Sequence, residues 1–196
     1  MKKVLMIAIA AVMFATPAFA AIENSLHDFS ADGYGTTEIC VFCHTPHNAQ
    51  AIVNAPLWNH ENSTANYTPY SSTTLTATVG QPTSISKLCL SCHDATVAID
   101  SFGTNAGTAA NFVTGAPALG TNLADDHPVG FAYDAALVSA DGGLNDPTSA
   151  AIAPLLFANN LECASCHDVH NGIPTNAAML RIDNTTSGLC LTCHNK

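Results

Sequence analysis

Apolar residues form one long run near the start of the chain and are scattered elsewhere. Two lysines at positions 2 and 3 precede an unbroken apolar run over residues 4–15, and a small-x-small triplet follows at 18–20. A charged start, a short apolar run and a small-residue cleavage site are typical of a secretory signal peptide. We therefore expect residues 1–20 to be removed and the mature protein to begin at Ala21.

Beyond this run the pattern predicts little regular structure. No other stretch approaches the roughly 20 apolar residues of a transmembrane helix, so we expect no membrane anchor. The segments 62–86, 103–124 and 135–156 are rich in Thr, Gly, Asn and Pro and predict wrapping loops. Such segments bury little apolar surface, so something other than a usual side-chain core must hold the fold together.

The eight cysteines all fall in four identical CxxCH frames. We call these frames the first to fourth attachment sites: 40–44, 89–93, 163–167 and 190–194. CxxCH is the signature of c-type haem attachment, in which two thiols form thioethers to one porphyrin and the next His ligates the iron. The sequence thus predicts four covalent haem c groups. The attaching residues are Cys40, Cys43, Cys89, Cys92, Cys163, Cys166, Cys190 and Cys193, and the proximal iron ligands are His44, His93, His167 and His194.

Two other uses of the cysteines compete with haem. Paired CxxC motifs also bind zinc, and even numbers of Cys in exported proteins also form disulfides. Neither use requires a His directly after the second Cys of every pair. The export signal also fits haem, because bacterial cytochromes c receive their haem after translocation.

The attachment motifs also predict the fold class. Cys and His at positions i and i+4 share one face of a helix, so we expect a short helix at each attachment site. Removing 20 of 196 residues leaves 176, or 44 for each of four haems. We therefore predict a multihaem cytochrome c fold that is mostly irregular, with short α-helices at the CxxCH sites, little β-structure and a haem-filled core.

The chain contains an internal duplication. Each half has an isolated His, then CxxCHxxH, then LCLxCH. The repeat is too long for a solenoid. It predicts two dihaem modules, 21–100 and 101–196, within one compact tetrahaem unit.

Five histidines lie outside the attachment motifs: His27, His47, His60, His127 and His170. Met179 is the only Met of the mature chain, so bis-histidine ligation at every haem is the economical assignment, with low-spin iron and low potentials. The duplication pairs His27 with His127 and His47 with His170, and we predict these four as sixth ligands. His60 has no counterpart, and we expect it to be a surface or hydrogen-bonded His.

Spacing restricts two of these ligands further. Two His on one iron place their α-carbons roughly 12 Å apart, given metal–nitrogen bonds of about 2 Å. Three residues span at most about 10–11 Å. His47 therefore cannot serve the iron of His44, nor His170 that of His167, and each must reach a neighbouring haem.

The mature chain is strongly acidic. Three basic residues, Lys87, Arg181 and Lys196, stand against 15 acids, which leaves a formal charge of −12. Such a charge disfavours nucleic acid and anionic lipid surfaces. It suits a cationic partner or a metal-bearing acceptor, although the acids also keep an exported protein soluble.

The order of motifs resembles a known family. LHDFS, CVFCHTPHNA, PLWN, KLCLSCHD, DDHPVGF, ECASCHDVHNG and LCLTCHNK follow one another along nearly the whole mature chain. Together they are similar to the small multihaem cytochromes c of metal-reducing bacteria, and most to the filament-forming tetrahaem OmcE type. The resemblance implies closely stacked bis-His haems, the same four sixth ligands, and head-to-tail polymerisation into extracellular wires in which a His of one subunit ligates a haem of the next.

Several functions remain open at this point. The leading expectation is an electron carrier that is not an enzyme and works with other cytochromes or extracellular metal-bearing acceptors. A discrete periplasmic carrier, a multihaem reductase of nitrogen or sulfur oxyanions with an open iron position, and a structural filament or sensor are the alternatives. The arm before Cys40 is short and polar, so His27 either ligates an iron of the adjacent subunit or folds back onto its own.

Overall fold

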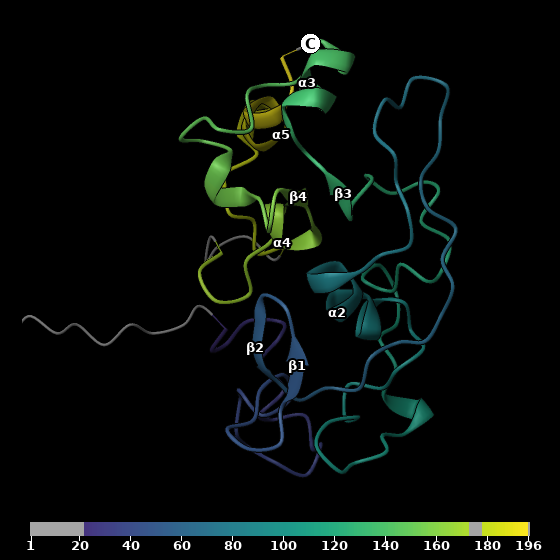
Figure 1. Cartoon of the computed structure of the whole chain (residues 1–196). Helices are drawn as coiled ribbons and strands as arrows, with labels where there is room; N and C mark the ends of the chain where they lie inside the picture. The colour runs from purple at the N-terminus through teal and green to yellow at the C-terminus, as the bar shows by residue number, and fades with distance from the viewer. Residues whose placement is uncertain (1–21, 173–177, 196) are drawn as a thin grey trace, which may run out of the picture.

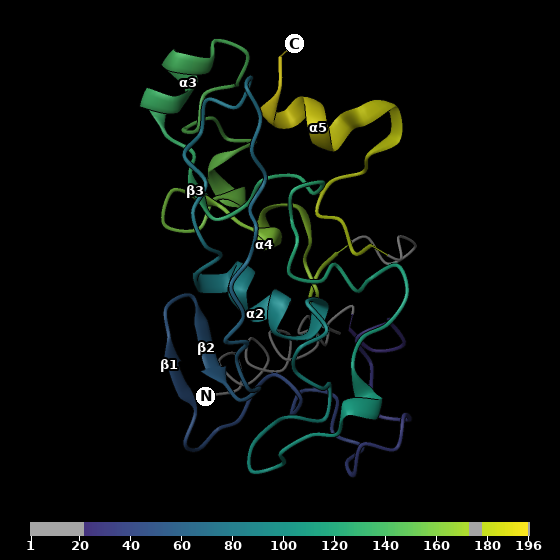
Figure 2. The same cartoon turned by 90° about the vertical axis from the view of Figure 1, so that its right-hand side faces the viewer.

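The computed structural model describes residues 22–172 and 178–195. The predicted signal peptide, residues 1–20, lies outside the described residues. The N-terminal part of the chain lies at one end of the molecule and the C-terminal part at the other, with helix α2 (Ser84–His93) between them (Figures 1 and 2).

Regular elements are few and short. The other helices are α3 (Ala135–Asp141), α4 (Cys163–Cys166) and α5 (Gly188–Cys193), with 3₁₀ turns η1 (Ala109–Asn111), η2 (Ala153–Leu155) and η3 (Thr185–Ser187). Strands β1 (Gln50–Ile52) and β2 (Ala55–Trp58) form one antiparallel pair, and β3 (Phe131–Ala132) and β4 (Asn160–Leu161) form another. The predicted fold class, mostly irregular with short helices and little β-structure, is confirmed. Among the described residues no helix has the length and apolar character needed to cross a bilayer.

Helices occur at three of the four attachment sites. Helix α2 ends within the second site, α4 lies in the third and α5 in the fourth. The first site forms only a turn, in which the carbonyl of Cys40 accepts the N–H of Cys43 at 3.2 Å and that of His44 at 2.8 Å. The prediction of a helix was therefore wrong there. The β-branched residues Ile39 and Val41 flank Cys40 and disfavour helix.

Helix α3 lies inside the segment 135–156, for which the sequence predicted loops. Its first turn is capped by Asp134, whose carboxylate accepts a bond from the N–H of Leu137 at 2.9 Å. Its last turn closes on Gly142, which has a φ of 69°. An N-cap Asp and a left-handed Gly are strong local helix signals, and they outweigh the polar composition of the segment.

The buried side chains form small separate clusters. One contains Phe131, Tyr133, Ile152 and Leu161, and a second contains Tyr67, Leu90 and Leu123. Contacts cross the predicted module boundary at 100/101, as where the rings of Phe42 and Phe102 lie 4.8 Å apart. The division into two modules stays a prediction.

Candidate functional site

The eight cysteines are all free of disulfide bonds. Burial is the main cause that raises the pKa of Cys43 to about 11, and the nearby Cys40 adds to it. Burial is also the main cause that raises the pKa of Cys92 to about 12, with a smaller contribution from nearby charges. Thiols of this kind stay protonated at neutral pH and are weak nucleophiles. Cys43 and Cys92 are therefore poor candidates for nucleophiles.

The second and third attachment sites meet through their sulfur atoms. A hydrogen bond between Cys89 and Cys163 is the main cause that raises the pKa of Cys89, and burial adds to it. The same bond is the main cause that lowers the pKa of Cys163. Helices α2 and α4, which carry these two cysteines, pack against each other. Thioethers formed at both positions would therefore bring the edges of two porphyrins together.

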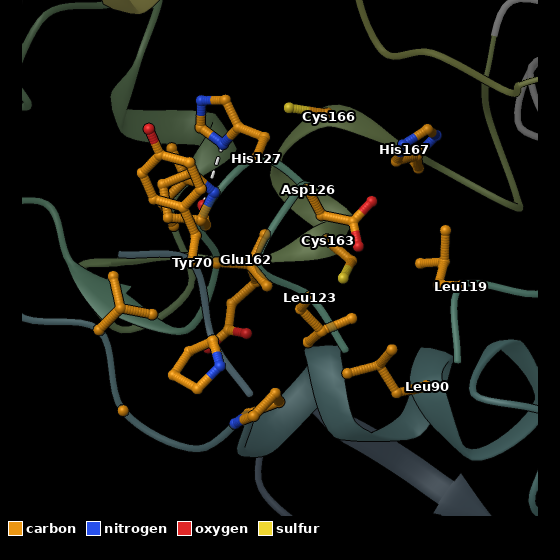
Figure 3. Close-up of a pocket in the computed structure, with 17 residues that line it drawn as sticks. Tyr70, Leu90, Leu119, Leu123, Asp126, His127, Glu162, Cys163, Cys166 and His167 are labelled. Carbon is orange, nitrogen blue, oxygen red and sulfur yellow. Dashed lines mark hydrogen bonds between the residues drawn. The ribbon is translucent and has the colours of Figure 1, made fainter. Parts of the chain in front are cut away.

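A pocket opens beside the third attachment site (Figure 3). Cys163, Cys166 and His167 line it together with apolar side chains, among them Leu90 and Leu123. An apolar wall with two thiols and an imidazole is the donor set that covalent haem requires.

Three proximal histidines are held through one ring nitrogen. In each of them Nδ1 lies close to a backbone carbonyl oxygen. The distance from Nδ1 to this oxygen is 2.9 Å for His44, 2.8 Å for His93 and 2.6 Å for His167. Nδ1 donates in each bond, because a carbonyl only accepts. Nε2 is left for a metal, which is the usual arrangement of a metal-bound His.

Three pairs of imidazole rings lie close together, each joining a proximal His to one outside the motifs. The ring centroids are 6.0 Å apart for His44–His170, 6.0 Å for His93–His27 and 6.3 Å for His194–His127. Two imidazoles on one iron, each with a metal–nitrogen bond of about 2 Å, hold their centroids roughly 6 Å apart. The residues present therefore fit an iron between the rings of each pair.

His27 has the character expected of an iron ligand. Its Nδ1 is buried and has no hydrogen-bond partner among the described residues. Burial, followed by the charges of His93 and His167, lowers the pKa of His27 to about 4. Its ring is therefore neutral at pH 7, and neutral imidazole is the form that binds metals.

The remaining two histidines differ sharply from each other. His47 is exposed, and within the described residues its ring pairs with no other ring. His60 is only 2% exposed, and both ring nitrogens lie near backbone carbonyl oxygens, of Glu61 at 2.8 Å and Ala98 at 3.0 Å. His60 is thus buried and hydrogen-bonded, which is one of the two fates expected for it, and its exclusion as a sixth ligand stays a prediction.

Three attachment sites end their helical turn in the same way. The chain leaves with extended backbone at His167 (φ −109°, ψ 141°) and His194 (φ −100°, ψ 138°), and His44 forms an antiparallel bridge with Trp58. A helical turn that stops here leaves its last carbonyls without the N–H groups that a longer helix would supply. These carbonyls need donors from elsewhere.

Short segments from other parts of the chain supply the donors. We call them the clip segments: 56–59, 143–145 and 178–181. At the first site, Asn59 donates its backbone N–H to Cys43 O at 2.8 Å and its Nδ2–H to Val41 O at 2.6 Å. In return, Leu57 O accepts the N–H of Thr45 at 2.8 Å.

The clip segment of the third site makes the same bonds with a different side chain. Arg181 donates its backbone N–H to Cys166 O at 2.9 Å and its Nε–H to Ala164 O at 2.6 Å. Met179 O accepts the N–H of Asp168 at 2.8 Å. Both 57 and 179 have positive φ, 60° and 52°, which is uncommon for Leu and Met.

The fourth site repeats the pattern once more. Asn145 donates its backbone N–H to Cys193 O at 2.8 Å, and its Nδ2 group donates to Leu191 O at 3.2 Å and to Thr192 O at 3.0 Å. Gly143 O accepts the N–H of Asn195 at 3.1 Å. Each clip segment thus bonds two carbonyls of its motif. One belongs to the residue directly after the first Cys, and the other belongs to the second Cys.

At the second attachment site, within the described residues, a distant segment bonds only the proximal His: His93 Nδ1 donates to Pro117 O at 2.8 Å, and His93 O accepts the N–H of Leu119 at 2.7 Å. Helix α2 ends at His93 with Asp94 as its C-cap (φ −83°, ψ −3°). The N–H of Asp94 bonds Leu90 O at 2.7 Å, and the N–H of Ala95 bonds Cys92 O at 3.0 Å. These are the same two carbonyl positions, capped here by the backbone that directly follows the motif.

The clip residues Asn59, Asn145 and Arg181 were missed by the sequence reasoning. The strings around Asn59 and Arg181 showed no recognisable chemistry. The one signal available was positional: a short apolar stretch ending in an amide or guanidinium donor stands after the first and the third motif.

Comparison with known families now bears on these sites. Residues 157–196, which contain the third and fourth attachment sites, match the family described as the doubled CXXCH motif. No curated protein matches the chain. The doubled motif supports a multihaem c-type cytochrome. It indicates covalent haem c binding and electron transfer, in agreement with the free thiols and the paired imidazoles.

Proposed function

We propose that the mature chain carries four haem c groups, each with two His ligands, and serves as an electron-transfer protein without substrate chemistry of its own. Bound haem c supplies an iron that gains and loses one electron. The ring pairs support this proposal most directly, since each joins an attachment-site His to one of the predicted sixth ligands at 6.0–6.3 Å. The residues of the chain hold the groups, orient the imidazoles and exclude water.

The ring pairs also suggest which ligand serves which haem. His27 and His127 each lie against the LCLxCH histidine of their own half, His93 and His194. His170, in contrast, lies against His44 of the other half. This agrees with the spacing argument, which required His170 to serve a haem other than that of His167.

His47 completes the set by the symmetry of the repeat. The first and third attachment sites are equivalent CxxCHxxH segments of the repeat. In a two-fold arrangement, a ligand that passes from one segment to the haem of the other implies a second ligand that passes in the reverse direction. His170 serves His44, so we assign His47 to the haem of His167. The neighbouring sulfur atoms of Cys89 and Cys163 then add a close approach between the second and third haems.

We further propose an exported, extracellular protein that polymerises head to tail, with a discrete periplasmic carrier as the alternative. Haem c attachment implies export, and the resemblance and the acidic charge support a partner outside the cytoplasm. The ring contact of His27 with His93 favours ligation within its own subunit, so a filament contact would not depend on this residue. Electron microscopy of the purified protein separates filament from monomer.

Mass spectrometry of the denatured mature protein tests the haem count. The proposal expects the polypeptide of residues 21–196 plus four haems. His127→Ala should keep all four haems but convert one iron to high spin, whereas His60→Ala should leave the spectrum nearly unchanged. Three haems or fewer, or bound zinc, would contradict the proposal.

A reductase with one open iron is the second candidate, and one observation favours it. His47 is exposed and pairs with no ring in the described part of the chain, so the third attachment site is where an open position would lie. Carbon monoxide binding to the reduced protein distinguishes the two functions. Binding to one haem in four supports the reductase, and no binding supports the carrier.

A further inference from the structure

The clip segments do more than close a turn, because they also carry the atoms that hold two proximal imidazoles. Pro56 O, three residues before Asn59, accepts from His44 Nδ1 at 2.9 Å. Ala178 O, three residues before Arg181, accepts from His167 Nδ1 at 2.6 Å. The clip side chain and the carbonyl partner of the imidazole thus belong to the same four-residue segment at each of these two sites.

Different side chains do the same work at equivalent positions. Asn59 and Asn145 reach the motif carbonyl with an amide, and Arg181 reaches it with Nε. The backbone N–H of all three residues makes the same bond to the second Cys, at 2.8–2.9 Å. Because the backbone is placed alike, an amide at position 181 would meet Ala164 O as Asn59 meets Val41 O.

We propose that Asn59, Asn145 and Arg181 are positioning residues for the first, fourth and third haems. Each side chain donates a hydrogen bond to a motif carbonyl that has no donor from the residues following the motif. This bond sets the orientation of the attachment turn. At the first and third sites it also sets the plane of the proximal imidazole. Bonds of this kind behind a metal-bound His tune ligand basicity and metal properties. The proposal rests on the proposed haem sites.

The guanidinium of Arg181 has additional contacts that must be separated from this role. It forms an ion pair with Asp168 at 3.3 Å and lies 5.7 Å over the ring of Phe157. Arg181→Asn removes both contacts but restores the amide donor used at the other two sites. Arg181→Ala removes the donor as well. The difference between the two variants therefore isolates the bond to Ala164 O.

The test compares these variants in the haem-loaded mature protein, with Asn66→Ala as a control at an exposed position. Mass spectrometry establishes the haem load, and electron paramagnetic resonance of the oxidised protein reports the axial ligand planes. Arg181→Ala should shift the signal and the midpoint potential of one haem in four. Arg181→Asn and Asn66→Ala should keep the wild-type signals, and Asn59→Ala should shift a different haem.

Wild-type signals in fully loaded Arg181→Ala would overturn the proposal, as would equal shifts in Arg181→Ala and Arg181→Asn. If Arg181→Ala loses a haem, the comparison moves to the load: retention by Arg181→Asn supports the proposal and equal loss overturns it. Wild-type protein with fewer than four low-spin haems would instead refute the proposed function, whatever the variants do.

Discussion

In the second attachment site the N–H of Asp94 bonds the carbonyl of Leu90, four residues earlier in the same helix. In the first site the equivalent carbonyl, that of Val41, is bonded by the side chain of Asn59 from the end of β2. The two motif carbonyls are bonded by the chain that directly follows in one site, and by a segment that folds back in the other. The carbonyls of the same CxxCH motif are thus capped locally in one case and by tertiary structure in the other, although His93 also bonds a distant segment, at Pro117 O.

This difference has a consequence for folding. Helix α2 bonds its motif carbonyls with its own following backbone, and its Leu90 is packed to 1% exposure. The first site lacks a helix and depends on the β1–β2 hairpin to present its clip segment. Substitutions that break helical bonds should therefore harm the second site most, and substitutions that remove donors should harm the first.

The largest effect should come from proline placed directly before the first Cys of each motif. Leu88 lies inside α2, whereas the N–H of Ile39 makes no backbone bond in the described part of the chain. Leu88→Pro should lower the free energy of unfolding by at least about 3 kcal/mol, because it removes a helical bond and clashes with the preceding turn. Ile39→Pro should cost much less. Urea unfolding of the haem-loaded protein measures both.

Leu88→Ala is the control that removes the buried side chain without the proline ring. If Ile39→Pro lowers the free energy of unfolding as much as Leu88→Pro, the first site also depends on backbone N–H bonds before its first Cys. The proposed difference between the two sites would then be wrong.

A smaller effect is expected where α2 supports the third site. Ser86 is fully buried, donates its hydroxyl to the carboxylate of Glu162, and accepts the N–H of Cys163 at 3.0 Å. Ser86→Ala leaves a buried carboxylate without that donor and should cost about 2 kcal/mol in urea unfolding. The exposed Ser72→Ala is the control, and a loss under about 0.5 kcal/mol for Ser86→Ala would show that the two sites are not joined through this residue.

A moderate effect should follow from removing the donor of the first site. Asn59→Ala leaves the partly buried Val41 O without its partner, and one unsatisfied acceptor of this kind costs about 1–2 kcal/mol. Asn66→Ala, at an exposed position, should change the free energy of unfolding by less than about 0.5 kcal/mol. Equal unfolding midpoints in urea for the two variants would mean that the bond of Asn59 contributes nothing.

The smallest effect should be that of Arg181→Asn. The ion pair with Asp168 is partly exposed, with 26% and 13% of the two side chains accessible, and such pairs contribute about 0–1 kcal/mol. Because Asn can make the clip bond, the unfolding free energy should fall by no more than about 1 kcal/mol. A loss above about 2 kcal/mol would show that the guanidinium contacts, and not the clip bond, stabilise the third site.

The comparison also explains how far the sequence could be interpreted. The four attachment sites, the loop-rich fold and the helices at three sites follow from short-range patterns, because Cys spacing and helical bonds are local. Helix α3 was also local, with Asp134 and Gly142 as its signals, but the composition of its segment hid it.

The clip segments were out of reach for a physical reason. A carbonyl left free at a helix end needs a hydrogen-bond donor, but the sequence does not indicate which residue supplies it. Asn59 and Arg181 follow their motifs, whereas Asn145 precedes its own, and an amide and a guanidinium share no sequence motif. The pairing of sixth ligands was undetermined for the same reason, since it depends on which segments meet in space.

A structure of the haem-loaded protein at a resolution that shows the axial ligands tests the account most directly. We expect four irons, bound by His44 with His170, His93 with His27, His194 with His127, and His167 with His47, all within one subunit. An iron bound by His60, an iron with a single His ligand, or His27 bound to an iron of a neighbouring subunit would contradict the account.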